Sequence, residues 1–147
     1  MSLQNLSKIG QLETHETNAE QVRRMVDSAE RSIADARQEA ISLETRLDAA
    51  YRAITQLCLV ALWANGYRPA KSQPGHHQTM IQSLVHSIGL DRDQTFLLDT
   101  FRVKRNAIDY TGDDVDEASV DECISAANSL SRHLVHWLSN NKPELIK

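Results

Sequence analysis

Hydrophobic residues recur every three or four positions along most of the chain, which is the spacing of one buried face of an amphipathic helix. No segment alternates between hydrophobic and polar residues for long enough to predict a strand. The sequence therefore predicts an all-α fold, an antiparallel bundle of four to five helices. The first two expected helices span residues 19–40 and 42–65, and the third runs from His76 to Gly89. The fourth runs from a cap at Asp91 or Asp93 to Thr111, and the fifth from a cap at Asp116 to about Asn140.

The second predicted helix should be the most deeply buried. Its residues are hydrophobic almost all round from Ile54 to Trp63, whereas a helix with one side in water keeps polar residues along that side. Gly66 provides the stop, because glycine adopts the left-handed turn at a helix end at little cost. We expect this helix at the centre of the bundle.

A single domain accounts for most of the chain of 147 residues. We place it at residues 18–140, with a flexible N-terminal tail at 1–17 and a C-terminal tail at 141–147. The N-terminal segment carries a hydrophobic residue at every third position from Leu3 to Leu12, so docking on the domain as a short helix is the alternative. Tyr67 to Gly75 contains Pro69 and Pro74 and shows no periodicity, which predicts a loop.

The overall charge limits the classes of partner. The formal net charge is −4 and the pI is near 5.8, so the chain lacks the general positive charge of proteins that bind duplex nucleic acid. Any contact with nucleic acid must therefore be local. No hydrophobic run is long enough to cross a membrane, and the first residues lack a signal-peptide pattern. We expect a cytoplasmic protein with no membrane contact, in which Cys58 and Cys123 are buried, reduced thiols.

Histidine and glycine patterns argue against a metal or a bound cofactor. His76 and His77 are adjacent, and adjacent helical side chains point about 100° apart, so they do not easily share one ion. His133 and His136 are three residues apart but lack flanking carboxylates. The glycines stand singly at helix ends instead of forming a phosphate-binding loop. We expect neither a metal nor a cofactor.

Cations, an amide, a carboxylate and a phenol gather near the end of the fourth predicted helix, between Arg102 and Tyr110. Arginine suits phosphate because its planar fork makes two parallel hydrogen bonds. One interpretation is an ordinary helix end with an Arg105–Asp109 ion pair; the other is a site for a phosphate of RNA or a nucleotide. Because residues three and four apart are neighbours on a helix, one face should hold Arg102, Arg105, Asn106 and Asp109.

The order of several short stretches resembles the HEPN superfamily (higher eukaryotes and prokaryotes nucleotide-binding), of which this chain looks like a small bacterial member over residues 18–140. A helical bundle whose late helix ends in Arg-Asn, with a histidine a few residues on, is the hallmark of that family. The stretches that carry the resemblance are Ala49-Ala50-Tyr51-Arg52-Ala53-Ile54, Ala61-Leu62-Trp63-Ala64-Asn65-Gly66-Tyr67-Arg68, Gly75-His76-His77 and Lys104-Arg105-Asn106-Ala107-Ile108-Asp109-Tyr110.

The resemblance implies roles for residues of the cluster. In active HEPN ribonucleases an arginine is followed by four to six residues and then by a histidine. Arg105 matches that arginine and Asn106 matches the polar residue after it, but Tyr110 stands where the histidine would be. A phenol is a poorer general base at neutral pH than an imidazole. The candidate ligand-binding residues are Arg102, Arg105, Asn106, Tyr110, His76 and His77, and no catalytic residue is assigned.

Two classes of function follow from the resemblance, and a third from the residues alone. The first is a non-catalytic module that binds RNA, a nucleotide or a protein partner such as a nucleotidyltransferase. The second is a metal-independent ribonuclease of the toxin or defence type, in which Tyr110, His76 or His77 replaces the usual histidine. The third is a helical scaffold whose cluster only pairs internally. The resemblance also implies a homodimer, in keeping with hydrophobic positions such as Trp63 and Phe96 beyond those one bundle needs.

Overall fold

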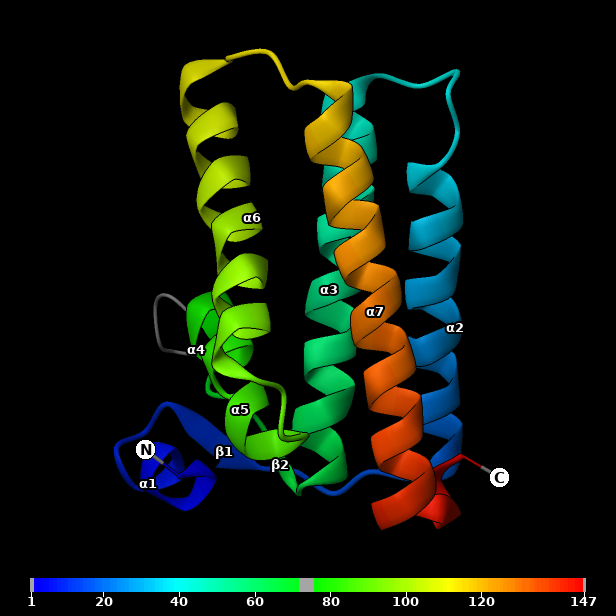
Figure 1. The fold of residues 1–147 in the computed structure, drawn as a ribbon. Helices are drawn as coiled ribbons and strands as arrows, with labels where there is room; N and C mark the ends of the chain where they lie inside the picture. The colour runs from blue at the N-terminus through cyan, green and yellow to red at the C-terminus, as the bar shows by residue number, and fades with distance from the viewer. Residues whose placement is uncertain (1, 72–75, 147) are drawn as a thin grey trace.

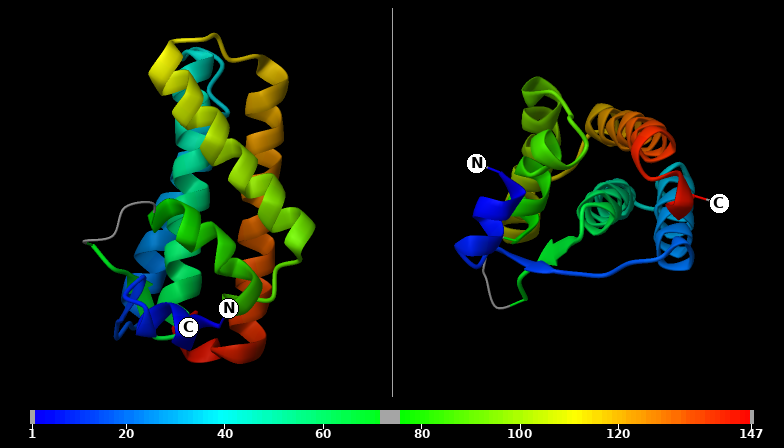
Figure 2. Two further views of the ribbon diagram at one scale, coloured as in Figure 1. Left: turned by 90° about the vertical axis from the view of Figure 1, so that its left-hand side faces the viewer. Right: turned by 90° about the horizontal axis from the view of Figure 1, so that it is seen from below.

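Four long helices form the body of the molecule: α2 (Ala19–Ala36), α3 (Leu43–Ala64), α6 (Arg92–Thr111) and α7 (Glu117–Asn141). The computed structural model describes residues 2–71 and 76–146, and in it α3 stands between the other three helices (Figures 1 and 2). The predicted all-α helical bundle is confirmed. Shorter elements lie toward the lower end of the bundle in Figure 1: α1 (Leu3–Lys8), β1 (Leu12–Thr14), β2 (Tyr67–Pro69), α4 (His76–Gln82), α5 (Leu84–Ser87) and the 3-10 helix η1 (Pro143–Leu145).

The central helix α3 is buried on nearly all sides, as its hydrophobic composition predicts. It packs against α2 and α7 along most of its length, and against α4 and α6 on another side. Leu57, Cys58 and Leu62 are completely inaccessible to solvent. Because α3 is covered by other helices, its few polar side chains must find partners inside the protein. Two of these polar residues, Tyr51 and Arg46, matter below.

Side chains cap the N-terminal ends of the long helices. Asn18, Asp91 and Asp116 each accept a hydrogen bond from the backbone N–H three residues later. This confirms the predicted cap at Asp116 and selects Asp91 over Asp93 for α6. At the other end of α6, Gly112 takes a left-handed conformation with φ of 72°. This turn ends the helix directly after the predicted cluster.

Helix α2 ends at Ala36, four residues before the predicted end at residue 40. Arg46 of α3 is buried, and its Nε donates a hydrogen bond of 2.7 Å to the carbonyl oxygen of Ala36. In a longer helix that carbonyl would accept a hydrogen bond from the backbone N–H of Ala40. Ala40 is instead an exposed residue outside the helix. The Arg46 side chain thus provides the hydrogen bond that one more helical turn would have given to this carbonyl.

The N-terminal segment is part of the fold, so the predicted flexible tail is wrong for residues 2–17. Leu3 in α1 and Leu12 in β1 are buried. Strand β1 pairs antiparallel with β2, in a register that places Leu12 opposite Pro69 and Thr14 opposite Tyr67. Each strand has three residues, which is too short for an alternating pattern to be recognised. The predicted loop from Tyr67 therefore begins as a strand, and its residues 72–75 lie outside the described part.

Two more predictions need correction. The single helix expected from His76 to Gly89 is divided into α4 and α5 at Ser83, whose Oγ donates to the carbonyl oxygen of Met80 at 2.7 Å. The expected C-terminal tail contains η1, in which Leu145 is buried beside α2 and α7. Among the described helices, none combines the length and the hydrophobicity that crossing a bilayer requires.

Candidate functional site

A hollow of about 620 Å³ opens where α2, α3, α4 and α6 meet. Helix α3 contributes Asp48, Tyr51 and Arg52 to its wall, α4 contributes His77, and α6 contributes Arg105. Arg105 and His77 were both predicted site residues, and folding brings them to one hollow although they lie on different helices. The structure therefore supplies a histidine beside Arg105 that the spacing along the chain does not.

Arg105 is the cation at the edge of this hollow. Its Nε donates to the Asp48 carboxylate at 3.0 Å and lies 4.0 Å from the Asp109 carboxylate. Its guanidinium carbon sits 5.3 Å from the centre of the Tyr51 ring, within the range of a cation–π interaction. The predicted Arg105–Asp109 pair exists, but the shorter contact is to Asp48 of a different helix. The side chain of Arg105 is 32% exposed, so part of it faces solvent.

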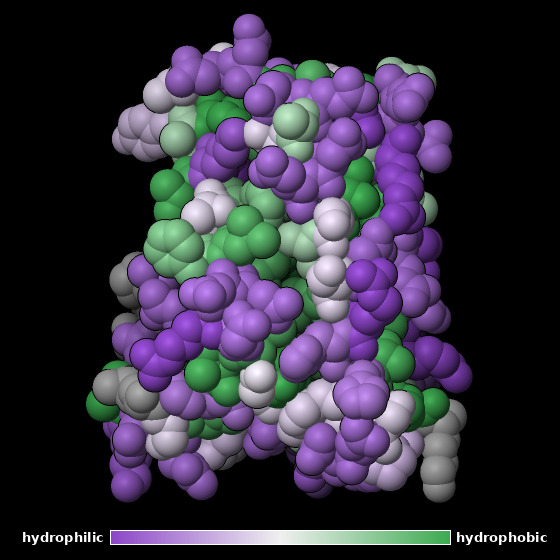
Figure 3. All heavy atoms as spheres, in the orientation of Figure 1, coloured by the Kyte–Doolittle hydropathy of each residue, from purple (hydrophilic) through white to green (hydrophobic). Residues whose placement is uncertain are grey.

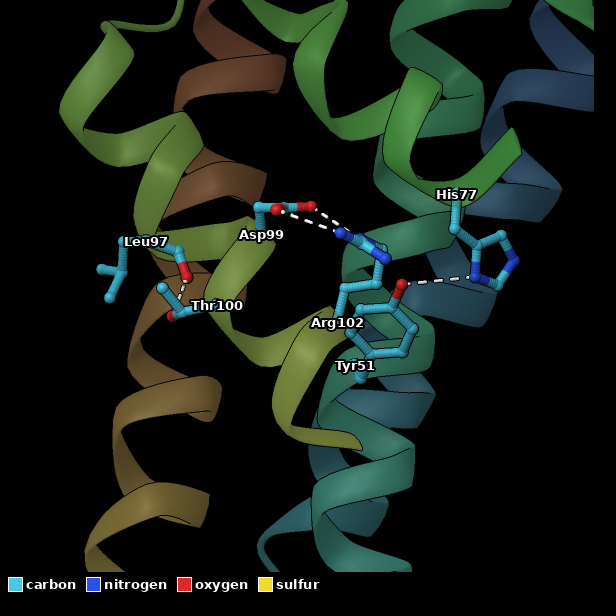
Figure 4. Close-up of polar contacts among 6 residues, drawn as sticks. All are labelled: Tyr51, His77, Leu97, Asp99, Thr100 and Arg102. Carbon is cyan, nitrogen blue, oxygen red and sulfur yellow. Dashed lines mark hydrogen bonds and ion pairs between the residues drawn. The ribbon is translucent and has the colours of Figure 1, made fainter. Parts of the chain in front are cut away.

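Tyr51 forms a buried part of the wall of the hollow. It is only 2% exposed, and its hydroxyl lies 3.2 Å from Nδ1 of His77 (Figure 4). Burial raises the pKa of Tyr51 to about 12, so the phenol keeps its proton at neutral pH. A phenol that donates to Nδ1 leaves the ring proton of a neutral imidazole on Nε2.

His77 is held in its neutral form. Burial lowers the pKa of His77. The neighbouring charges of His76, Arg105 and Arg102 lower this pKa further. At neutral pH, therefore, the uncharged ring of His77 can donate a hydrogen bond from Nε2, and Arg105 carries the positive charge of the pair.

Arg102 is already paired within its own helix. Its guanidinium makes two hydrogen bonds with the Asp99 carboxylate, at 2.6 and 3.2 Å, and it lies beside the Tyr51 ring (Figure 4). Donating hydrogen bonds to the Asp99 carboxylate raises the pKa of Arg102. Asp99 thus occupies one edge of the Arg102 guanidinium and offsets part of the positive charge that Arg102 brings near the site.

The other predicted site residues lie apart from the hollow. Asn106 is exposed, Tyr110 is 95% exposed, and neither is among the described residues that line the hollow. The physical reason is the turn of the helix: Tyr110 is five residues from Arg105, which places it about 140° round α6. His76 is also exposed, and its ring meets that of His77 edge to face with centroids 5.0 Å apart.

The sequence did not single out Asp48, Tyr51 and Arg52 as site residues. Tyr51 appeared only within a stretch that carries the family resemblance, without a role in the site. One signal was available: a buried tyrosine needs a partner for its hydroxyl, and the partner here is His77. Asp48 carried no comparable signal, because its pairing with Arg105 joins residues 57 positions apart.

Two cysteines and a further histidine among the described residues are buried or hydrogen-bonded. Burial raises the pKa of both the Cys58 and the Cys123 thiol, which keeps them protonated. Nε2 of His133 lies 2.8 Å from the carbonyl oxygen of Ile88. In the described part of the chain, histidine, cysteine and carboxylate side chains nowhere gather in threes at metal-binding distances.

Comparison with known proteins yields no relative. Neither the family models, nor the curated proteins, nor the solved structures searched contain a match to this chain.

Proposed function

We propose that this protein binds a phosphate group of RNA or of a nucleotide in the hollow beside Arg105, and does so without cleaving it. The observation that supports this most is the meeting of a partly exposed guanidinium and a neutral imidazole at one open hollow. Arg105 would give the charged hydrogen bonds and Nε2 of His77 a neutral one. The HEPN resemblance of the sequence is consistent with this proposal and supplied its first motivation.

The groups at the hollow suit binding better than cleavage. Transfer of a phosphate to the ribose hydroxyl needs one group that takes a proton and another that gives one. His77 can act as the base only if the Tyr51 hydroxyl releases its Nδ1. With a pKa near 12, Tyr51 is too weak an acid at neutral pH to fill the other, and the guanidinium of Arg105 does not lose its proton.

A metal-independent ribonuclease is the second candidate, and one observation favours it. The histidine missing after Arg105 in the sequence has a spatial substitute in His77, which lines the same hollow. A second group, from a partner subunit or from the RNA itself, would then complete the proton transfer. The nucleotidyltransferase partner implied by the resemblance also stays a prediction.

One set of measurements tests the proposal. Labelled single-stranded RNA is titrated with the protein in EDTA at low salt, with ATP and inorganic phosphate as competitors. We expect saturable binding and intact RNA, with binding lost in Arg105→Ala and weakened in Arg105→Lys, because an ammonium does not reproduce the two parallel hydrogen bonds. Arg132→Ala is the matched control, since Arg132 is exposed on α7 away from this hollow.

Each outcome has a separate meaning. Stronger competition by ATP than by unlabelled RNA of equal phosphate concentration would identify a nucleotide site. Cleavage of the RNA that disappears in Arg105→Ala and in His77→Gln would replace the binding proposal with the ribonuclease. Binding that Arg105→Ala leaves unchanged, with an unchanged circular dichroism spectrum, would favour the scaffold.

A further inference from the structure

A second hollow, of about 480 Å³, opens at the upper end of the molecule in Figure 1, where the connection between α2 and α3 meets α7. We call it the upper hollow. Its charged and amide side chains come from both sides: Arg37, Glu39 and Arg46 from the α2 end and α3, and Asp121, Asn128 and Arg132 from α7. Figure 3 shows mainly hydrophilic side chains over the upper part of α7, unlike the hydrophobic ones between α6 and α7.

Arg46 is the unusual residue of the upper hollow. It is only 6% exposed, and a charged residue buried this deeply normally pairs with an opposite charge. Among the described residues, however, no carboxylate oxygen lies within 4.0 Å of its guanidinium. Its hydrogen bond within the described part of the chain runs from Nε to the carbonyl oxygen of Ala36. Arg46 therefore carries a buried positive charge without a carboxylate partner.

The end of α2 offsets only part of the charge of Arg46. A helix C-terminus is equivalent to about half a negative charge, and Ala36 uses one of the five N–H donors of the guanidinium. Within the described residues, the enclosed side-chain nitrogen and oxygen atoms that lack a hydrogen bond are limited to Ser87 Oγ. The two terminal nitrogens of Arg46 thus keep contact with solvent, through the upper hollow that Arg46 lines. A pair of donors in this position suits a carboxylate, which accepts two parallel hydrogen bonds.

Arg37 is a second arginine of the upper hollow without an acidic partner. It directly follows the last residue of α2 and is exposed. In the described part of the chain it has no carboxylate within 4.0 Å, although Glu39 and Asp121 line the same hollow. These two carboxylates repel an incoming anion in proportion to its charge. They therefore disfavour RNA and doubly charged phosphate more than a carboxylate of charge −1.

We infer that the upper hollow binds a small dicarboxylate, with one carboxylate on the terminal nitrogens of Arg46 and the other on Arg37. Two arginines without acidic partners match the two carboxylates of such a ligand. The amide of Asn128, which also lines the hollow, offers a neutral donor beside them. The volume lies within the range of about 300–1,000 Å³ that is usual for small-molecule sites. Because Arg46 also ends α2, the ligand should stabilise the connection between α2 and α3.

This site is independent of the proposed phosphate site. Arg46 and Asp48 are two residues apart on α3, which places their side chains about 200° apart round the helix. The two hollows have no lining residue in common among the described residues. Arg132 also lines the upper hollow, but its Nη2 donates to Ser129 Oγ at 3.4 Å on its own helix, so the inference does not depend on it. Measurements on the Arg105→Ala protein therefore test this inference alone.

NMR titration of the full chain carrying Arg105→Ala tests the inference. Succinate, acetate and inorganic phosphate are added separately, with sodium chloride keeping the ionic strength equal. The Nε–H of Arg46 reports on the site, because its hydrogen bond to Ala36 slows exchange with water. We expect a saturable shift of this signal with succinate and a dissociation constant of about 0.1–10 mM, the range for two charge-assisted hydrogen bonds. Acetate should bind at least about fivefold more weakly, since it has no second carboxylate for Arg37.

Succinate that causes no saturable shift, or only the shift that chloride alone causes, would overturn the inference. Tighter binding of phosphate than of succinate would overturn the choice of a dicarboxylate.

Two substitutions test the assigned contacts. Arg37→Ala should weaken succinate to the level of acetate and leave acetate unchanged. Its matched control is Arg23→Ala, since Arg23 is exposed on α2 about 21 Å earlier along the helix axis. Asn128→Asp puts a carboxylate into the upper hollow without touching the bond between Arg46 and Ala36, and should raise the dissociation constant of succinate at least about tenfold. Succinate binding of undiminished strength in both Arg37→Ala and Asn128→Asp would place the ligand elsewhere and refute the site.

Discussion

Replacing Asp48 by asparagine should strengthen phosphate binding, because Asp48 competes with the ligand for Arg105. The Asp48 carboxylate lies 3.0 Å from Nε of Arg105, and the two side chains are 50% and 32% exposed. Asparagine keeps the shape and can still accept the hydrogen bond, but it removes the negative charge. A phosphate that approaches the guanidinium would then meet neither the competing carboxylate nor its repulsion.

The exposure of the pair sets the size of the effect. Two unit charges 3.0 Å apart attract by about 5.5 kcal/mol at an effective dielectric constant near 20, but by only about 1.4 kcal/mol in bulk water. Exposed ion pairs measure about 0.2–1 kcal/mol, so we take the upper end, about 1 kcal/mol. This corresponds to roughly fivefold tighter binding. Loss of the pair should lower the melting temperature by no more than about 4 °C for a chain of this size.

Fluorescence anisotropy with labelled RNA, and competition by inorganic phosphate, would measure the change. Asp109→Asn is the matched control: its carboxylate is 4.0 Å from the same Nε, so its effect should be smaller. The gain should also shrink as salt is raised, since mobile ions screen exposed charges. The reasoning is refuted if Asp48→Asn weakens binding, or if the gain persists in the Arg105→Ala background, where no guanidinium is left to release.

Two further predictions concern stability and pH. Leu57→Ala should lower the free energy of unfolding by about 2–5 kcal/mol, because Leu57 is completely buried in α3 and its truncation leaves a cavity; a urea midpoint equal to that of the wild type would contradict this. The free energy of unfolding should fall as the pH drops below about 6.5, the ordinary pKa of histidine. Burial lowers the pKa of His77 in the folded protein, so below this pH the unfolded chain binds more protons than the folded one. His77→Gln should flatten this part of the pH profile, measured by urea unfolding at several pH values, and a profile unchanged by that substitution would assign the effect elsewhere.

Local patterns in the sequence were enough to predict most of the fold. The three-and-four spacing identified the long helices, and short-range chemistry identified several of their ends: Asp91 and Asp116 as caps, and Gly66 as a stop. These signals involve residues within one helical turn of each other, so they operate without knowledge of the tertiary structure. The central position of α3 was likewise evident from its composition.

Elements that depend on distant parts of the chain were not predictable in the same way. Helix α2 ends early because Arg46 of the next helix binds the carbonyl of Ala36. Strand β1 exists because β2, more than fifty positions later, completes its hydrogen bonds. The N-terminal segment was polar enough to be assigned to solvent, yet Leu3 and Leu12 found a buried place against the bundle.

The candidate site also has one part that the sequence predicted and another that only the tertiary structure decided. The sequence identified Arg105, His76 and His77 as chemically notable residues, since their types and order were sufficient for that. Only packing decided that His77, and not Tyr110, lies at the same hollow as Arg105. Packing also decided that Asp48 neutralises part of the charge of Arg105. It placed Tyr51 in contact with both Arg105 and His77. The helical turn sends Tyr110 to the outer surface of α6, and the meeting of α3, α4 and α6 puts the histidine, the arginine and the carboxylate at one hollow.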